Sequence, residues 1–276
     1  AFGMFLINIP GSKEILFAAP NPEIGEKGGL LYFLYQGVDL VIYPPLIFLG
    51  IGAMTDFGPM IANPKSMLLG AAAQLGIFVT FIGGLLLGDL ISPLIDKSVL
   101  PDGYGALEAA ATAIIGGADG PTAIYVASKL APTLVPTIAI AAYSYMALVP
   151  IIQPAVIRCT TTKKERLIRM DYTDRHASKS VKIFFPIITT VVAGLIAPQS
   201  LALVGFLMFG NLIKECGVLG TLADTAKNAL ANLITLLLGI TIAFQMQAEK
   251  FLSLQTLMIM GLGLFAFVFD TVGGIM

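Results

Sequence analysis

The sequence predicts an all-α membrane protein with several spanning helices, some of them broken. Hydrophobic residues make up 57% of the 276 residues and charged residues only 12%, whereas soluble domains carry about a quarter charged residues. The apolar residues gather in long segments, and glycine and proline interrupt several of them. At roughly 20 residues per crossing, the chain has room for about six to eight crossings of a lipid bilayer.

The expected apolar segments alternate with shorter polar stretches. Residues 8–37 mix prolines, glycines and charges, which indicates a loop outside the membrane. The apolar segments follow at residues 38–54, 66–95, 106–127, 132–157, 181–197, 201–214, 229–246 and 253–276.

Residues 158–182 differ from the rest because they hold eight of the sixteen basic residues. A short basic loop between apolar segments belongs on the cytoplasmic side. The loop could also dock a cytoplasmic partner, but its apolar flanks argue against nucleic acid. The basic residues are Arg158, Lys163, Lys164, Arg166, Arg169, Arg175, Lys179 and Lys182.

This loop divides the chain into a first membrane half at 1–157 and an incomplete second half at 183–276. Both ends lie in apolar runs, so we expect a fragment cut at each end. A weak repeat supports two halves: residues 46–51 resemble 236–240, and 70–78 resemble 261–265, each about 190 residues on. Many transporters consist of two such halves, often inverted relative to one another, and their sites lie between the halves. The partner of residues 116–122 would then lie near position 308.

The sharpest chemical feature is the segment Ile114-Ile-Gly-Gly-Ala-Asp-Gly-Pro-Thr-Ala-Ile-Tyr125. Glycine permits non-helical dihedrals and proline removes a backbone donor, so we expect a helix break near the membrane middle. Asp119 lies at the break, and an ionisable residue inside a membrane indicates function. It could cap the next half-helix and bind a hard cation as well. The expected participants here are Gly117, Asp119, Gly120, Pro121 and Thr122.

A second polar cluster, Tyr143, Ser144, Tyr145 and Gln153, punctuates the next apolar segment. Tyrosines can anchor a helix at the membrane surface. Tyr145, however, lies 13 residues before Arg158, which is roughly 20 Å deeper in a helix. A buried phenol beside a cation could lose its proton more easily.

Two further stretches interrupt the apolar pattern. Residues 54–64 contain Asp56 and Asn63, and form either a turn at the membrane surface or a re-entrant element facing the same cavity. Residues 209–217 contain Asn211, which interfacial placement explains better than chemistry. No P-loop, dinucleotide fingerprint or zinc spacing occurs, so energy must come from an ion gradient or a partner. Cys159 and Cys216 are expected to be free thiols.

With these residues in view, the chain resembles the β subunits of biotin-dependent Na⁺-translocating decarboxylases, which act on oxaloacetate, methylmalonyl-CoA or glutaconyl-CoA. The resemblance runs over nearly the whole chain. It rests on Gly52-Ala-Met-Thr-Asp-Phe-Gly-Pro59, Leu69-Gly-Ala-Ala-Ala-Gln-Leu-Gly-Ile-Phe78, Ile115-Gly-Gly-Ala-Asp-Gly-Pro-Thr-Ala-Ile-Tyr125, Ala142-Tyr-Ser-Tyr-Met-Ala-Leu-Val-Pro150, Phe209-Gly-Asn-Leu212 and Phe251-Leu252.

The resemblance implies a membrane subunit that decarboxylates carboxybiotin, consumes a proton and moves Na⁺ outward. It implies Na⁺ binding by Asp119, helped by Thr122, with Tyr145 binding Na⁺ and delivering the proton. Gly117, Gly120, Pro121, Asp56, Asn63, Ser144, Gln153 and Asn211 are the expected surroundings of this site.

The resemblance also implies partners: a carboxyltransferase and biotin-carrier subunit, a small γ or δ membrane subunit, and further copies of the chain in a trimer or dimer. The location it implies is the bacterial inner membrane, with many crossings. The family's second broken helix carries a motif like Asn-Pro-Leu-Ile-Gly…Gly-Val-Ser, which these 276 residues lack. A stand-alone Na⁺-coupled carboxylate transporter or exchanger is the alternative.

Overall fold

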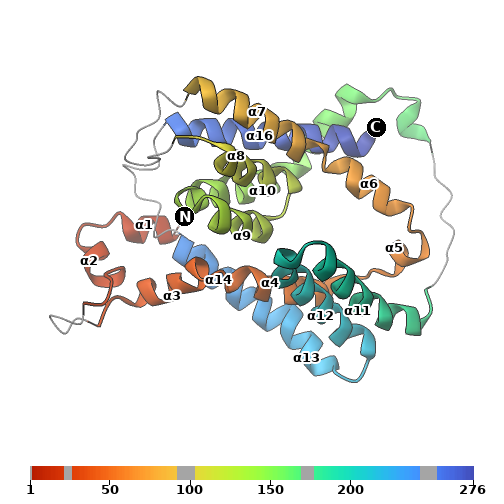
Figure 1. The fold of residues 1–276 in the computed structure, drawn as a ribbon, viewed down its shortest axis with the longest axis horizontal. Coiled ribbons are helices and arrows are strands. Elements are labelled where there is room, and N and C mark those ends of the chain that lie inside the picture. Colours follow the sequence, from red (N-terminus) through yellow and green to blue (C-terminus); the bar gives the residue numbers. More distant parts are fainter. Residues whose placement is uncertain (1, 22–26, 92–102, 169–176, 243–253) are drawn as a thin grey trace. The chain divides into compact units, whose positions relative to one another are not determined.

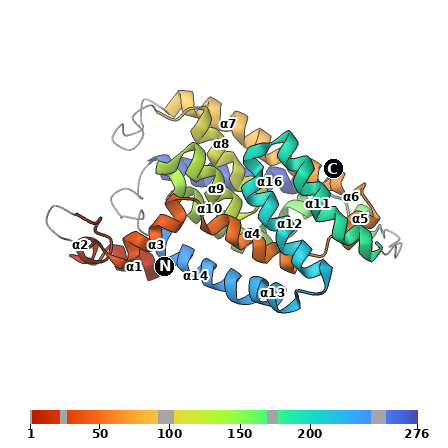
Figure 2. The same ribbon diagram turned by 60° about the horizontal axis from the view of Figure 1, so that its bottom comes forward.

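The computed structural model describes residues 2–21, 27–91, 103–168, 177–242 and 254–276, and these are almost entirely helical. The chain forms two compact units, each assembled from an early and a late stretch. Unit 1 comprises residues 1–63 and 175–247, and unit 2 comprises 64–174 and 248–276. The predicted halves 1–157 and 183–276 follow chain order instead, and their relation as inverted repeats stays a prediction. Figures 1 and 2 show the helices of both units.

Unit 1 is built on α4, which packs against α12, α14 and the π-helical segment η6. Its other helices extend this core, with α11 on α12 and α3 on α14. The bounds in unit 1 are α1 Phe2–Ile7, α2 Ser12–Leu16, α3 Leu30–Asp39, α4 Tyr43–Met54, α5 Gly58–Ala62, α11 Lys179–Ile196, η5 Pro198–Ser200, α12 Leu201–Cys216, α13 Gly220–Asp224, η6 Thr225–Leu230 and α14 Ala231–Thr241.

Two glycines bring α4 and α12 into backbone contact. A Cβ atom on Gly52 would lie 1.8 Å from the carbonyl oxygen of Leu207, and one on Gly210 would lie 2.0 Å from that of Leu49. Small residues permit such close helix crossings in membranes, where apolar side chains gain little by leaving lipid. The α4–α12 crossing therefore depends on glycine at both positions.

Unit 2 is organised around α16, which packs against α6, α7, α10 and the 3₁₀ segment η2. Figure 1 shows α16 running beside α7. The bounds in unit 2 are α6 Ser66–Ala73, α7 Leu75–Ile91, α8 Ala106–Ala113, η2 Ile114–Gly117, α9 Gly120–Leu130, η3 Pro132–Leu134, α10 Val135–Thr160, η4 Glu165–Leu167 and α16 Leu254–Ile275.

The two pairs of similar segments pack together, each within one unit. Residues 46–51 lie in α4 and 236–240 in α14, which are neighbours in unit 1. Residues 70–78 lie in α6 and α7, and 261–265 lie in α16, which packs against both in unit 2. Each similarity therefore joins helices that share an interface.

Three helices in the described ranges are long and apolar enough to cross a membrane: Ser66–Gly88, Lys179–Ile196 and Thr256–Ile275. Two bent pairs raise this number to five. The expectation of six to eight crossings concerns the whole chain and stays a prediction. Most of the described length of the predicted apolar segments is helical.

The bent pairs have identifiable causes. Leu30–Asp39 and Tyr43–Met54 meet at 68°, where Val41 adopts a φ of 58° and Pro44 lies in the first turn of the second helix. The second pair, Pro132–Met146 and Leu148–Thr160, meets at 64°. Pro150 lies inside this helix, and proline clashes with the carbonyl four residues earlier.

The expected loop at 8–37 is wrong in part, because α2 and most of α3 fall inside it. Its charges and prolines all precede Gly28, whereas residues 30–35 are Leu-Leu-Tyr-Phe-Leu-Tyr. This apolar run forms the first arm of the bent pair. The basic loop 158–182 includes residues 169–176, which lie outside the described residues, as does Phe251-Leu252. Cys159 and Cys216 are free thiols, as expected.

The α4–α12 crossing gives a stability prediction. We expect Gly52→Ala to lower the free energy of unfolding by about 1–3 kcal/mol, because the new methyl group meets a backbone oxygen that cannot move aside. Gly239→Ala in α14 is the matched control, since a Cβ there meets nothing within 4 Å. The control should be neutral, or stabilised by up to about 1 kcal/mol through helix propensity. Thermal unfolding in detergent measures both, and equal effects would contradict the predicted crossing.

Candidate functional site

The predicted helix break is present in unit 2. Helix α8 continues into the 3₁₀ segment η2, Ala118 then adopts left-handed backbone (φ 54°, ψ 31°), and Asp119 is extended before α9 begins at Gly120. Pro121 occupies the first turn of α9, where its missing N–H removes no helical bond. The Gly-Gly pair and the proline thus end one helix and start the next, as the sequence predicts.

Asp119 stands at the N-terminus of α9. Its carboxylate Oδ2 accepts a hydrogen bond from the Thr122 hydroxyl, one turn into the helix. It occupies the capping position without a side-chain capping bond to a backbone N–H. The Thr122 N–H nevertheless faces the carboxylate, so Asp119 places its negative charge at the start of α9. Capping and ion binding are therefore compatible at this position.

The two tyrosines of α10 have different surroundings. The ring of Tyr143 lies against Gly120, where a Cβ atom would approach its Cζ to 2.6 Å, and it interacts electrostatically with Asp119. Tyr145 is buried; its hydroxyl donates to the carbonyl oxygen of Met260 at 2.5 Å. Two residues along a helix point in widely different directions, so only Tyr143 lies directly on the break. The sequence analysis favoured Tyr145.

Unit 2 contains a cavity of about 320 Å³ beside the break. Gly116, Gly117 and Ala118 form one wall, and Gln74, Gln153 and Asp270 contribute polar side chains. Gly117 and Gln153 thus line this cavity, whereas Ser144 is exposed and does not line it.

Asp270 was not predicted as a site residue. It is the one charged residue of α16, within the candidate span Thr256–Ile275. The sequence carried one signal for it, since an acidic residue inside an apolar span is expensive and indicates function. Its neighbours come from α7 and η2, and no local pattern reveals them.

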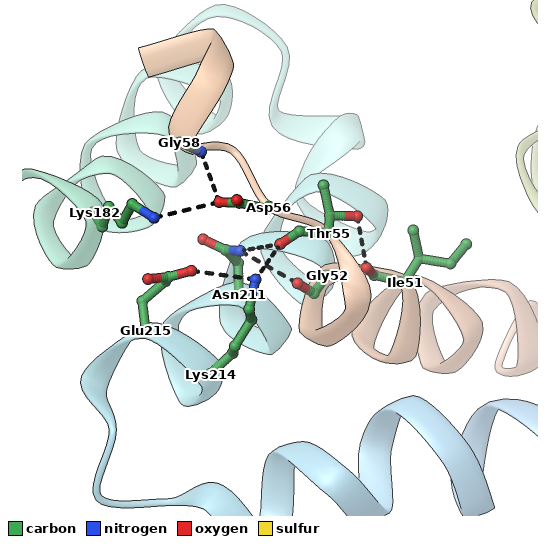
Figure 3. A network of polar contacts seen from close by, with 9 residues as sticks. All are labelled: Ile51, Gly52, Thr55, Asp56, Gly58, Lys182, Asn211, Lys214 and Glu215. Carbon is green, nitrogen blue, oxygen red and sulfur yellow. Dashed lines mark hydrogen bonds and ion pairs between the residues drawn. The ribbon is translucent and has the colours of Figure 1, made fainter. Parts of the chain in front are cut away.

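The remaining predicted residues, Asp56, Asn63 and Asn211, belong to unit 1. Asn211 is almost fully buried and donates from Nδ2 to the carbonyl oxygens of Gly52 (3.3 Å) and Thr55 (3.0 Å), as Figure 3 shows. Helix C-termini leave carbonyls without helical partners. Asn211 therefore caps the end of α4.

Charged side chains surround this helix end (Figure 3). Lys214 donates to the Thr55 carbonyl at 3.0 Å and pairs with Glu215 at 3.3 Å. Asp56 accepts from the Gly58 N–H at 2.9 Å and pairs with Lys182 at 3.4 Å. The Gly58 N–H, followed by the Lys182 ammonium, lowers the pKa of the exposed Asp56 carboxyl. Asp56 is therefore an ionised turn residue, and Asn63 ends the short helix α5.

Comparison with known proteins identifies the family to which the chain belongs. The family model described as "Na⁺-transporting oxaloacetate decarboxylase beta subunit" matches residues 1–276. The chain belongs to this family. It therefore groups with membrane subunits of Na⁺-transporting decarboxylases, which favours that reading over a stand-alone transporter.

Curated relatives of this β-subunit family match over the same region. The chain is 51% identical to a methylmalonyl-CoA decarboxylase subunit beta of Propionigenium modestum, covering all of this chain and 70% of the relative. It is 46% identical to a glutaconyl-CoA decarboxylase subunit beta of Acidaminococcus fermentans (100% and 67%). It is also 46% identical to an oxaloacetate decarboxylase beta chain of Klebsiella pneumoniae (100% and 61%). The chain thus spans roughly three fifths to seven tenths of these relatives' length.

The cap on α4 gives a second prediction. Asn211→Leu should lower the free energy of unfolding by about 1–3 kcal/mol, because the Gly52 and Thr55 carbonyls lose a buried donor. Thermal unfolding in detergent measures the loss. Lys214→Met, which removes a half-exposed donor to the same Thr55 carbonyl, should have a clearly smaller effect. A larger effect for Lys214→Met would contradict the assignment of Asn211 as the principal cap.

Proposed function

We propose that this chain contributes the membrane site at which decarboxylation of carboxybiotin is coupled to outward Na⁺ transport. The observation that carries the proposal is the Asp119 carboxylate at a helix break within an apolar helical unit, directly after three residues, 116–118, that line a cavity. Broken helices offer carbonyls and helix ends to ions in many transporters. Family membership supports Na⁺ as the ion.

In this proposal Na⁺ is the transported substrate, and Asp119 supplies its negative charge. Thr122 already donates its proton to Asp119, so the lone pairs of its hydroxyl are left for a cation. Tyr145 donates its proton to the Met260 carbonyl, so the lone pairs of its oxygen are likewise free to bind a cation. Oxygen ligands of this kind suit a hard cation.

Carboxybiotin supplies the driving reaction. The bond between the ureido nitrogen and the carboxylate carbon breaks, the electron pair stays on nitrogen, and CO₂ leaves. The nitrogen then takes up one proton, so each turnover consumes a proton. If Na⁺ binding and loss of a proton from Tyr145 favour one another, the two processes become thermodynamically linked. Asp119 and Tyr145 would provide that linkage without a covalent intermediate on the chain.

The distribution of basic residues indicates how the site is oriented in the membrane. Basic residues gather at 158–182, and short loops rich in Lys and Arg stay in the cytoplasm. We place this loop on the cytoplasmic side of the bacterial cell membrane. A carboxyltransferase with a biotin carrier would deliver carboxybiotin there. A small γ or δ membrane subunit and further copies of the chain, as a trimer or dimer, would complete the assembly. Inverted repeats would form the two halves of each chain.

The proposal for Asp119 is tested by substitution in the native decarboxylase complex. Asp119→Asn keeps the shape of the side chain but removes its charge, so Na⁺-dependent decarboxylation and ²²Na⁺ uptake into proteoliposomes should both be lost. Thr122→Val should weaken Na⁺ activation, and Thr122→Ser should restore it by returning the hydroxyl. Undiminished ²²Na⁺ uptake by Asp119→Asn would refute the assignment.

The partner proposal has its own test. Affinity purification of the chain from its native membrane should bring down a biotinylated protein that an avidin blot detects, together with carboxyltransferase activity. The control is the same purification from cells lacking the tagged chain. A purified, Na⁺-transporting complex without any biotinylated subunit would revive the stand-alone transporter.

A further inference from the structure

We propose that Asp270 is a positioning residue for the Asp119 site: its carboxylate, held between a glycine of α7 and a glycine of η2, fixes the broken segment that presents Asp119. This inference rests on the proposed function of Asp119. Asp270 lies in α16, whereas Asp119 precedes α9.

The first step is the contact between α16 and α7. A Cβ atom on Gly76 would lie 2.2 Å from Asp270 Oδ1 and 2.4 Å from the Ala266 carbonyl oxygen. Only a residue without a side chain lets the carboxylate reach this point. Asp270 therefore touches the backbone of α7 directly.

Gly76 lies where the apolar span Ser66–Gly88 is locally interrupted. Helix α6 ends at Ala73 and α7 begins at Leu75, and the Ile77 N–H bonds the carbonyl of Gln74, three residues back, at 3.1 Å. Such an interruption leaves N–H groups that protein must satisfy inside a membrane. The N–H groups of Gly76 and Ile77 face the Asp270 carboxylate, which supplies negative charge at this helix start.

The second step is the contact with the break. A Cβ atom on Gly116 would lie 2.7 Å from Asp270 Oδ2 and 3.0 Å from Ala266 Cβ. Gly116 lies within η2, three residues before Asp119. The same carboxylate thus borders the interruption in α7 with one oxygen and the broken segment with the other.

One oxygen of the Asp270 carboxylate lacks a hydrogen-bond partner. Oδ1 is buried and makes no hydrogen bond of ordinary geometry. Buried acceptors in native proteins normally have partners, so an exception calls for a role. Charge attraction to the start of α7 and close packing against Gly116 provide one, because together they hold η2 at a set distance from α7.

The fourth step links this contact to ion binding. Gly116, Gly117, Ala118 and Asp270 border the same cavity. Ala118 is held in left-handed backbone, which non-glycine residues adopt only when their surroundings impose it. If Asp270 helps to impose it, loss of the carboxylate lets the segment relax and moves Asp119 away from the geometry that binds Na⁺.

The test separates positioning from stability and uses the native complex. Asp270→Asn should raise the Na⁺ concentration for half-maximal decarboxylation by about tenfold or more, since small displacements of binding groups have large effects. The maximal rate at saturating Na⁺ should stay close to wild type. A purely structural defect would do the reverse, because it lowers the number of active molecules and leaves their Na⁺ dependence unchanged.

A second variant approaches the same contact from the other side. Gly116→Ala drives a methyl group into Asp270 Oδ2 and should shift the Na⁺ dependence in the same direction. Gly261→Ala is the matched control: it lies on α16, and its Cβ would meet nothing within 4 Å. It should leave the Na⁺ dependence unchanged. Na⁺-induced thermal stabilisation in detergent, compared with choline, measures binding independently of turnover and should weaken in both test variants.

The outcomes are distinct. A folded Asp270→Asn protein with unchanged half-saturating Na⁺ overturns the inference, and if that variant does not fold, an unchanged value for Gly116→Ala overturns it. Loss of activity in Asp119→Asn beside normal Na⁺ dependence in Asp270→Asn would remove this inference and leave the proposed function standing. Normal Na⁺ transport by Asp119→Asn would remove the proposed function first.

Discussion

Polar backbone inside an apolar protein is the constraint on which this structure depends. Lipid offers no partners to N–H and C=O groups, so each helix that stops inside the membrane must find partners within the chain. In unit 1 the carbonyls at the end of α4 are met by Asn211 and Lys214. In unit 2 the start of α9 faces Asp119, and the start of α7 faces Asp270. At each of these three helix ends, polar side chains from the same unit thus face the backbone groups that lack helical partners.

Glycine makes this matching possible. Polar side chains such as Asn and Asp are short, so their helices must approach closely before they can reach a neighbouring backbone. Gly52 and Gly210 allow this between α4 and α12, and Gly76 and Gly116 allow it around α16. The glycines lower helix propensity, but helices in lipid gain their stability from such contacts. The same residues weaken each helix locally and strengthen the packed unit.

Several of these features could be predicted from sequence because their causes are local. The break at 114–121 follows from Gly-Gly and Pro within one turn, and the helices follow from unbroken apolar runs. Tyr143 was named only as a member of a polar cluster, and Asp270 was not predicted as a site residue. Distant residues decide which face of α10 meets Gly120 and which glycines meet α16, so no local pattern could single them out. The division into two units has the same origin, since each unit joins stretches far apart in sequence.

The split composition of unit 2 has a consequence for synthesis. Helices α6 to α10 precede residue 174, but α16, which packs against most of them, begins only at Leu254. About 100 residues of synthesis separate the two, which takes roughly 5–20 seconds at typical elongation rates. During that interval the nascent chain holds Gly76 and Gly116 without the helix that covers them. Because of this order of synthesis, unit 2 can pack fully only after α16 has been made.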